Sequence, residues 1–196
     1  MGYFDIINFM LYYITSNQDK IRVAKKYLSP FEIIFEGKDM ELFEKQSDDI
    51  REIAIEKAKQ AYAVIKQPLF VNDAGWHITA LNGFPGSFMK FVNGWLTAEY
   101  ILNLMSPHTN REVILREVVC YIDDTKIKPF IGEKKGIVLH TNTDSTDIPS
   151  RSIISLSSTG KSISECWKEG IPPAEDYTVW QEFGKWYSNN LQCVMI

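Results

Sequence analysis

Two carboxylates in the first half of the sequence stand where a divalent cation can bind. Asp73 closely follows an apolar run at residues 68–71, which predicts a buried strand. Ligands of open α/β sheets gather at the carboxyl ends of such strands, and Mg²⁺ prefers a few carboxylates plus substrate oxygens. Glu44, in a polar stretch upstream, is a candidate second ligand. The alternatives are a turn-forming aspartate and a solvent-exposed glutamate.

A lysine interrupts an apolar helix face. The periodicity predicts an amphipathic helix that begins near Asp48 or Asp49, and Lys57 occupies a position of its apolar stripe. One interpretation places this ammonium in a cleft, facing phosphate. The other has the side chain snorkel, with its stem packed and its charge in water. The stripe otherwise consists of Ile50, Ile53, Ala54, Ala58, Ala61 and Ile65.

Small polar residues separate the first predicted strand, residues 10–15, from the helix that follows. Thr15, Ser16 and Asn17 form this junction, and Lys20 lies one turn inside the helix. A helix N-terminus offers unpaired backbone N–H groups and a positive dipole end, so the junction can bind phosphate with help from Lys20. The alternative is an ordinary helix cap with a solvated lysine. The GxxxxGK[ST] pattern of a P-loop is absent.

Two glycines and a proline within residues 82–86 predict a tight loop whose backbone can approach a ligand closely. Ser87 is placed to cap a short helix after this loop, and that helix carries Lys90. The loop is therefore a further candidate wall of a binding site.

The elements that must position these residues alternate between strand and helix and then form a hairpin. This order predicts an α/β protein with a mixed sheet flanked by helices. The predicted strands are residues 10–15, 31–35, 68–71, 111–123 and 127–140, and the predicted helices run from 16 or 17 to 30, from 48 or 49 to 65, from 96 to 105 and from 174 to 191, with a loop at 140–150.

Composition limits the partners. The formal net charge is -4 and the pI is near 5.4, which argues against nucleic acid or an anionic membrane as the main partner. No apolar run reaches the roughly 18 residues of a membrane span. Three scattered cysteines, Cys120, Cys166 and Cys193, argue against a disulfide framework or a zinc site, so a cytoplasmic location is expected.

Five segments, taken in order and spacing, resemble the inosine-triphosphate pyrophosphatase family. The first matches its [TS]-x-N-x-x-K signature and the fourth its [ED]-D-[ST]-[GC] strand end, while the last is similar to its A-L-G-G-x-P-G-x-[YF]-x-[KR]-[WF] loop. The second is a single glutamate and the third a helix that carries a lysine. The segments are Tyr13–Lys20, Glu44, Ile53–Ala58, Leu69–Gly75 and Ala80–Phe91.

The resemblance implies an elongated α/β protein of two lobes, with a nucleotide cleft between them, that forms a homodimer. Residues 1–196 would be one domain, with a core lobe at about 10–105 and 150–196 and a hairpin lobe at about 106–149. The implied activity is Mg²⁺-dependent hydrolysis of nucleoside triphosphates, including inosine or xanthosine triphosphate, between the α- and β-phosphates. The products would be a nucleoside monophosphate and pyrophosphate.

The same resemblance assigns roles to single residues. Asn17 and Lys20, within the Thr15-Ser16-Asn17 junction, would hold the phosphate tail with help from Lys57. Glu44 and Asp73 would place Mg²⁺, and Asp73 would also orient or deprotonate the attacking water. Phosphoryl chemistry depends mainly on charge neutralisation and positioning, which such groups supply. Phe88 and Lys90 would lie near the subunit boundary or the substrate. We expect these side chains to converge on one crevice.

The second half departs from the family pattern. The family reads the purine with F-G-W-D-x-x-F and K-N-x-x-S-H-R segments, and neither is present; residues 149–155 stand roughly where the first belongs. Asn72 replaces an acidic residue beside Asp73. Trp180 can stack on a base, although its place on the apolar stripe of the last helix also favours core packing. Arg151 either replaces a lost basic residue or is an ordinary surface arginine.

Three functions remain open from the sequence. The first is an active pyrophosphatase with altered or relaxed base choice. The second is a nucleotide-binding sensor that has lost catalysis, favoured by Asn72 and the rewritten base segment. The third is a related phosphatase that acts on another phosphorylated small molecule and releases orthophosphate.

Overall fold

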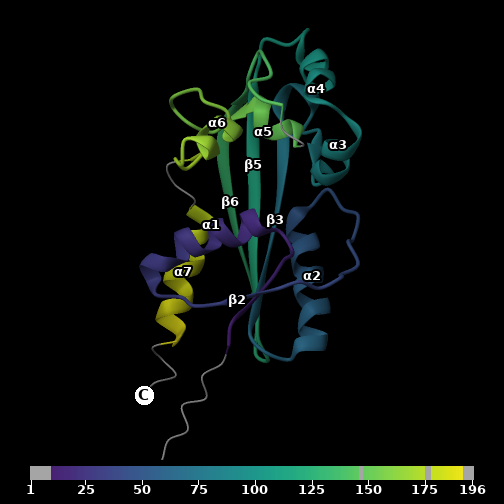
Figure 1. Ribbon diagram of the computed structural model, residues 1–196. Helices are drawn as coiled ribbons and strands as arrows, with labels where there is room; N and C mark the ends of the chain where they lie inside the picture. Colours follow the sequence, from purple (N-terminus) through teal and green to yellow (C-terminus); the bar gives the residue numbers. More distant parts are fainter. Residues whose placement is uncertain (1–9, 146–147, 175–177, 192–196) are drawn as a thin grey trace, which may run out of the picture.

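The computed structural model describes residues 10–145, 148–174 and 178–191. Helices and strands alternate along an elongated molecule whose long strands run most of its length (Figure 1). In chain order the elements are β1 (Tyr12–Ile14), α1 (Gln18–Leu28), a 3₁₀ turn (Ser29–Phe31), β2 (Glu36–Lys38), α2 (Ile50–Ile65), β3 (Leu69–Ile78), a second 3₁₀ turn (Thr79–Leu81), β4 (Pro85–Gly86), α3 (Met89–Trp95), α4 (Ala98–Met105), β5 (Glu112–Ile122), β6 (Ile127–Val138), α5 (Pro149–Ile153), β7 (Ile154–Ser155), α6 (Ile163–Lys168) and α7 (Thr178–Leu191).

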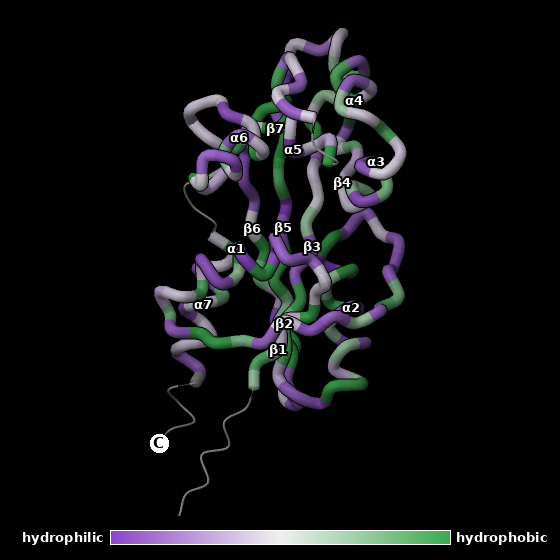
Figure 2. Tube along the Cα trace, viewed as in Figure 1, coloured by the Kyte–Doolittle hydropathy of each residue, from purple (hydrophilic) through white to green (hydrophobic). Residues whose placement is uncertain are grey.

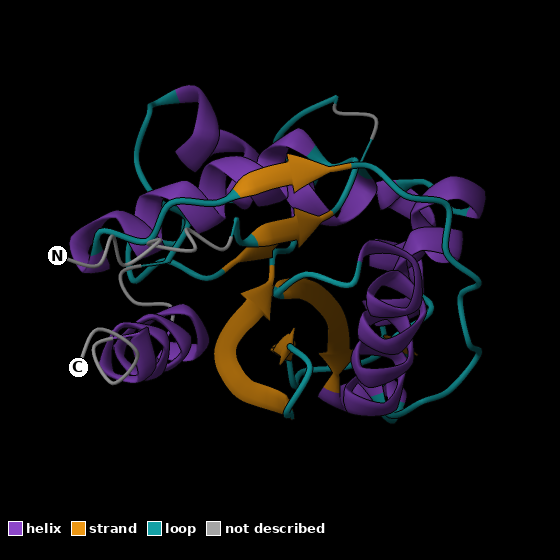
Figure 3. Cartoon of the chain, turned by 90° about the horizontal axis from the view of Figure 1, so that it is seen from below, coloured by secondary structure: helices purple, strands orange, loops and turns teal. Residues whose placement is uncertain are grey.

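The strands form one mixed, curled sheet. Their order is β2-β1-β3-β5-β6-β7, and β4 pairs with β3. Strand β1 is parallel to both β2 and β3, whereas the other pairs are antiparallel. Helices cover both faces of the sheet (Figure 3). The predicted α/β class with a mixed sheet is therefore confirmed.

The predicted hairpin is present as β5 and β6, whose register runs from Glu112 opposite Ile137 to Ile122 opposite Ile127. Strand β5 also pairs with β3 along the full length of β3, from Leu69 to Ile78. The hairpin thus continues the core sheet without a break. The lobe boundaries at about 106 and 149 stay a prediction.

Three predicted elements differ from the structure. The strand expected at 31–35 begins only at Glu36, because a 3₁₀ turn ends at Phe31 and Glu32 adopts a left-handed φ of 55°. The strand expected at 68–71 continues to Ile78, because pairing with β5 holds its polar second half extended. The helix expected at 96–105 is α4, which begins only at Ala98 because Thr97 caps it, and the short helix expected to carry Lys90 is α3, which begins after Phe88 without a cap from Ser87. Part of the last predicted helix, 175–177, lies outside the described residues.

Apolar side chains fill both faces of the sheet. On one face α2 packs its buried stripe, including Ala54 and Ala58, against Val71 of β3. On the other, α1 and α7 enclose an aromatic cluster around Phe70 and Trp180. Figure 2 shows these hydrophobic segments meeting along the middle of the sheet. Within the described residues, no helix combines the length and hydrophobicity needed to cross a bilayer.

Two helical glycines give a matched test of this packing. A Cβ at Gly184 in α7 would overlap the ring of Phe31, whereas one at Gly94 in α3 would meet no atom of the described residues within 4 Å. We expect Gly184→Ala to lower the free energy of unfolding by about 1–3 kcal/mol through overpacking. Gly94→Ala should raise it by up to ~1 kcal/mol, because alanine favours helix. Urea denaturation measures both, and equal stabilisation by the two variants would contradict the close approach of α7 to Phe31.

Candidate functional site

One cavity of about 720 Å³ collects most of the residues singled out from the sequence. Its volume falls in the range of ligand sites, roughly 300–1,000 Å³. The lining comes from the N-terminus of α1, from α2, β3 and α3, and from α5 and α6 far along the chain. The predicted site residues that line it are Thr15, Ser16, Asn17, Lys20, Glu44, Lys57, Asp73 and Lys90.

The ammonium of Lys57 lies between two carboxylates. Its Nζ donates to Glu44 Oε1 at 2.8 Å and to Asp73 Oδ2 at 2.6 Å. The side chains of Lys57 and Asp73 are 19% and 16% exposed, and that of Glu44 is 37% exposed. Lys90 adds a longer ion pair to Glu44, at 3.6 Å. Lys57 therefore does not snorkel into open water; it holds two acidic groups together inside the cavity.

The electrostatics of this trio are mutual. Burial alone would lower the pKa of Lys57, but the charges and hydrogen bonds of Asp73 and Glu44 outweigh it and hold that pKa above its usual value. In turn, the hydrogen bond from Lys57 holds the pKa of Glu44 below its usual value. Asp73 is fixed further, because its Oδ1 accepts from the N–H of Ala74 at 3.0 Å. The Glu44 carboxylate thus stays ionised, and hydrogen bonds hold both carboxylates in place.

The junction before α1 is a helix cap that faces the cavity. Asn17 Oδ1 accepts from the N–H of Asp19 at 2.9 Å and of Lys20 at 3.3 Å, and Thr15 Oγ1 accepts from the N–H of Asn17 at 3.1 Å. Lys20 is partly buried rather than fully solvated, and its Nζ donates to the carbonyl of Asn72 at 2.9 Å. Burial lowers the pKa of Lys20, with Asp73 opposing. Both predicted features, a cap and a cavity-facing lysine, hold here.

The two carboxylates suit a metal ion that takes its remaining ligands from a substrate and from water. Within the described residues no group of three or more His, Cys, Asp or Glu side chains is placed to hold a metal ion, so the protein alone does not supply a full set of ligands there. Mg²⁺ commonly uses one or two carboxylates and completes its shell with phosphate oxygens and water. Glu44 and Asp73 fit that arrangement, with each carboxylate contacting both Lys57 and the metal ion.

Aromatic side chains also line the cavity. Trp76 of β3 and Trp167 of α6 line it, together with Arg151 and Asn93. Arg151 Nη2 binds Asp19 Oδ2 at 2.6 Å, so this arginine belongs to the cavity wall rather than to an open surface. Sequence reasoning missed both tryptophans and Asn93. Trp76 lies only three residues after Asp73, which was an available signal, but no local pattern indicates Trp167.

Two predicted substrate contacts lie elsewhere. Trp180 is fully buried, with its ring edge against Tyr13 and Phe70 and its Nε1 donating to Glu117 at 3.2 Å. A side chain enclosed in this way has no face left for a base, so the core-packing interpretation is the correct one. Phe88 does not line the main cavity. It lines a second one of about 430 Å³ whose walls are mainly aromatic and apolar.

Removing the Lys57 ammonium should destabilise the fold in a pH-dependent way. Lys57→Met leaves two half-buried carboxylates facing each other, and we expect a loss of about 1–2 kcal/mol at pH 7, between values for surface and buried pairs. The pKa of Glu44 is lower in the folded protein than in the unfolded chain, where it is about 4.3. Its ion pair with Lys57 therefore stabilises the fold fully above that unfolded pKa, and this stabilisation is lost as the pH falls through the folded pKa. The deficit of Lys57→Met should therefore shrink in acid.

Urea denaturation at pH 7 and near pH 3.5 measures this difference. Lys45→Met is the matched control, since Lys45 pairs with Glu52 at 2.9 Å on the surface and its loss should leave the free energy of unfolding nearly unchanged. A Lys57→Met variant as stable as wild type at both pH values would contradict the bridging role.

Sequence comparisons show which proteins this chain resembles. Residues 11–165 match the model of the Ham1 family. The proteins named dITP/XTP pyrophosphatase from Saccharolobus solfataricus and Methanopyrus kandleri are 34% and 35% identical to this chain, each over 125 residues. The first alignment covers 64% of this chain and 65% of the relative, and the second 63% and 66%. The chain thus spans just under two thirds of the length of these relatives.

Solved structures show the same fold. The HAM1 protein of Coxiella burnetii gives a TM-score of 0.72 at 18% identity, over 92% of this chain and 99% of that one. The Ham1 protein of Staphylococcus aureus gives 0.64 at 21%, over 81% and 88%. The relationship predicted from the five motifs is confirmed, and because the family model spans most of its length, this chain belongs to the Ham1 family.

Proposed function

We propose that this protein is a nucleoside-triphosphate pyrophosphatase that releases a nucleoside monophosphate and pyrophosphate. The observation that carries the proposal is the Lys57 bridge between Glu44 and Asp73, which shares one cavity with Lys20 and the N-terminus of α1. The curated relatives described above carry the name dITP/XTP pyrophosphatase. Their name and this geometry support the same reaction class.

The charged groups of the cavity suit a triphosphate. Lys20 and Lys57 offer positive charge, and the N-terminus of α1, the positive end of that helix's dipole, borders the same space. Glu44 and Asp73 would hold Mg²⁺, which when bound would neutralise phosphate charge and help align the displacement. Asp73, fixed by Lys57 and by the N–H of Ala74, is placed to accept a hydrogen bond from the attacking water and to draw off its proton.

The aromatic part of the lining suits a purine whose edge accepts hydrogen bonds. Asn93 Oδ1 accepts from the N–H of Ser150 at 3.3 Å, which orients the amide, and its NH₂ group can donate to a ligand. Arg151 offers donors only. A 6-oxopurine presents acceptors at O6 and N7, whereas adenine presents a donor at N6, which such groups leave unpaired. Inosine and xanthosine triphosphates are therefore the proposed substrates.

We also propose that the protein acts as a homodimer in the cytoplasm. Phe84, Phe88, Phe91 and Trp95 form an exposed aromatic surface beside the site, and such surfaces mark association sites. Cys120 and Cys166 are buried free thiols, as is usual in a reducing compartment.

A product assay separates this reaction from its alternatives. With Mg²⁺ present, we expect pyrophosphate release from inosine and xanthosine triphosphates, with kcat/KM at least about 10-fold above that for adenosine triphosphate, by the cost of an unpaired buried group. Chelation should abolish it. Binding of every nucleotide without turnover would favour the sensor, and orthophosphate as the product would favour the other phosphatase class.

Asp73→Asn tests the proposed water-orienting group. The amide is nearly isosteric but cannot take a proton, so we expect turnover to fall on the order of 10²–10⁴-fold while the unfolding midpoint changes little. Asp124→Asn, in the exposed turn between β5 and β6, is the control and should leave turnover unchanged. Near-normal turnover in Asp73→Asn would remove this residue from the mechanism.

Trp95→Glu tests the dimer. Trp95 is 75% exposed, and a charged side chain in its place should disfavour association. Sedimentation velocity should then show a monomer where the wild type sediments as a dimer. Ile34→Glu, at an 85% exposed apolar position outside the aromatic surface, should leave the dimer intact. A dimer that survives Trp95→Glu would place the interface elsewhere.

A further inference from the structure

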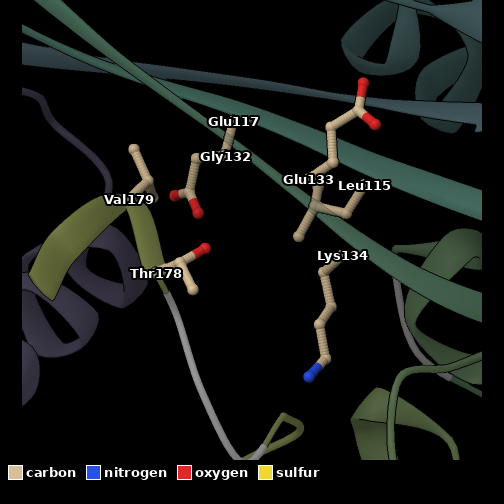
Figure 4. A pocket seen from close by; sticks show the side chains of 7 residues that line it. All are labelled: Leu115, Glu117, Gly132, Glu133, Lys134, Thr178 and Val179. Atoms are coloured by element: carbon tan, nitrogen blue, oxygen red, sulfur yellow. The ribbon is translucent and has the colours of Figure 1, made fainter. Parts of the chain in front are cut away.

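Glu117 is a buried carboxylate outside the cavity. It lies on β5 opposite Ala74, a residue that does line the cavity, and it is only 8% exposed. Figure 4 shows its side chain near Thr178 and Val179 at the start of α7, while Glu133 and Lys134 extend away. The space in front of it is about 10 Å³, room for about one water. Glu117 therefore does not bind a ligand directly.

Asn72 connects Glu117 to Lys20, the lysine proposed to bind phosphate. Its Nδ2 donates to Glu117 Oε1 at 2.9 Å, and its main-chain carbonyl accepts from Lys20 Nζ at 2.9 Å. The indole of Trp180 donates to the same Oε1 at 3.2 Å. Both donors to Glu117 are neutral, so these bonds orient its carboxylate without neutralising a negative charge.

Lys20 needs such a charge. Burial lowers its pKa, and the nearby ammonium of Lys57 lowers it further, while Asp73, Glu117 and Glu44 oppose that change. Asp73 and Glu44 both already hold the Lys57 ammonium, and the proposed Mg²⁺ would draw on the same two carboxylates.

The remaining groups near Lys20 do not supply the charge. Tyr13 is buried on the neighbouring strand, and burial together with Glu117 and Asp73 raises the pKa of its hydroxyl, so it stays neutral. Asp19, on the same helix, pairs with Arg151 and Arg22. Glu117 itself has a pKa raised by burial, against which Asn72, Lys20 and Trp180 act.

We propose that Glu117 is a positioning residue: it is the internal counter-charge of Lys20, linked to it through Asn72, and it keeps this lysine charged and in place inside the fold. The inference rests on the proposed function only in taking Lys20 as a phosphate-binding group. The charge balance between Lys20 and Glu117 can be measured without any turnover.

Glu117→Gln isolates the charge. Both hydrogen bonds to Glu117 end on Oε1, and glutamine keeps that oxygen as an acceptor. In the full-length variant we expect the titration midpoint of the Lys20 ammonium, followed by NMR, to fall by about one pH unit or more, as for loss of a nearby opposite charge. Glu133→Gln is the control: Glu133 pairs with Arg116 on the surface, and its loss should leave Lys20 unchanged. An unchanged midpoint in Glu117→Gln would overturn the proposal.

Exchanging the two side chains tests charge against packing. In the double variant Asn72→Asp/Glu117→Gln the carboxylate moves to position 72, while the new amide at position 117 can donate to it and still accept from Trp180. We expect the Lys20 midpoint to return towards the wild-type value. Failure to return would mean that Glu117→Gln acted through packing, and would also overturn the proposal.

Two further measurements cover the remaining outcomes. Should Glu117→Gln fail to fold, carbon NMR of the wild-type protein decides: Glu117 must be ionised at pH 7, and a protonated carboxyl there sinks the inference. Calorimetry should measure the affinity for inorganic tripolyphosphate, in the presence of a chelator, as the pH is raised. The affinity of Glu117→Gln should fall at a lower pH than that of the wild type, because its Lys20 loses the proton earlier. A shifted Lys20 midpoint with no tripolyphosphate binding by any variant would support the counter-charge and reject the proposed function instead.

Discussion

The contact of Lys57 with Glu44 and Asp73 is the constraint on which the site depends. Two carboxylates brought together in a half-buried place repel each other, and an ammonium between them turns that repulsion into attraction. The lysine comes from α2, one acid from β3 and the other from the segment before α2. The contact therefore fixes how a helix, a strand and a connecting segment meet, and it holds both acidic side chains where a cation or a water can reach them.

The sheet makes this contact possible and lets residues anchored on both of its faces reach one cavity. Lysines of α1 and α2 approach the middle of β3 from opposite faces, so Lys20 and Lys57 reach one cavity although different apolar clusters anchor their helices. Residues from α3, α5 and α6 complete the lining. The cavity thus combines charged groups with aromatic side chains, which suits a molecule that carries phosphates on a base.

The sequence could predict what local rules govern. Periodicity located α2 and the exception at Lys57, and turn chemistry located the hairpin; junction residues located the cap at Asn17. Local rules could not predict the aromatic part of the lining. Trp167 and Arg151 reach the cavity through contacts with Arg22 and Asp19 of α1, which lie well over a hundred residues away in the sequence. Trp180 shows the same limit: its periodicity was read correctly, but only the packing shows that no face of the indole is left exposed.

A crystal structure with a non-hydrolysable inosine triphosphate analogue and Mg²⁺ tests the central claim most directly. The account predicts the triphosphate beside Lys20 and Lys57, a metal ion on Glu44 and Asp73, and the base between Trp76 and Trp167. An analogue bound outside this cavity, or bound inside it with its phosphates between Trp76 and Trp167, would contradict the account.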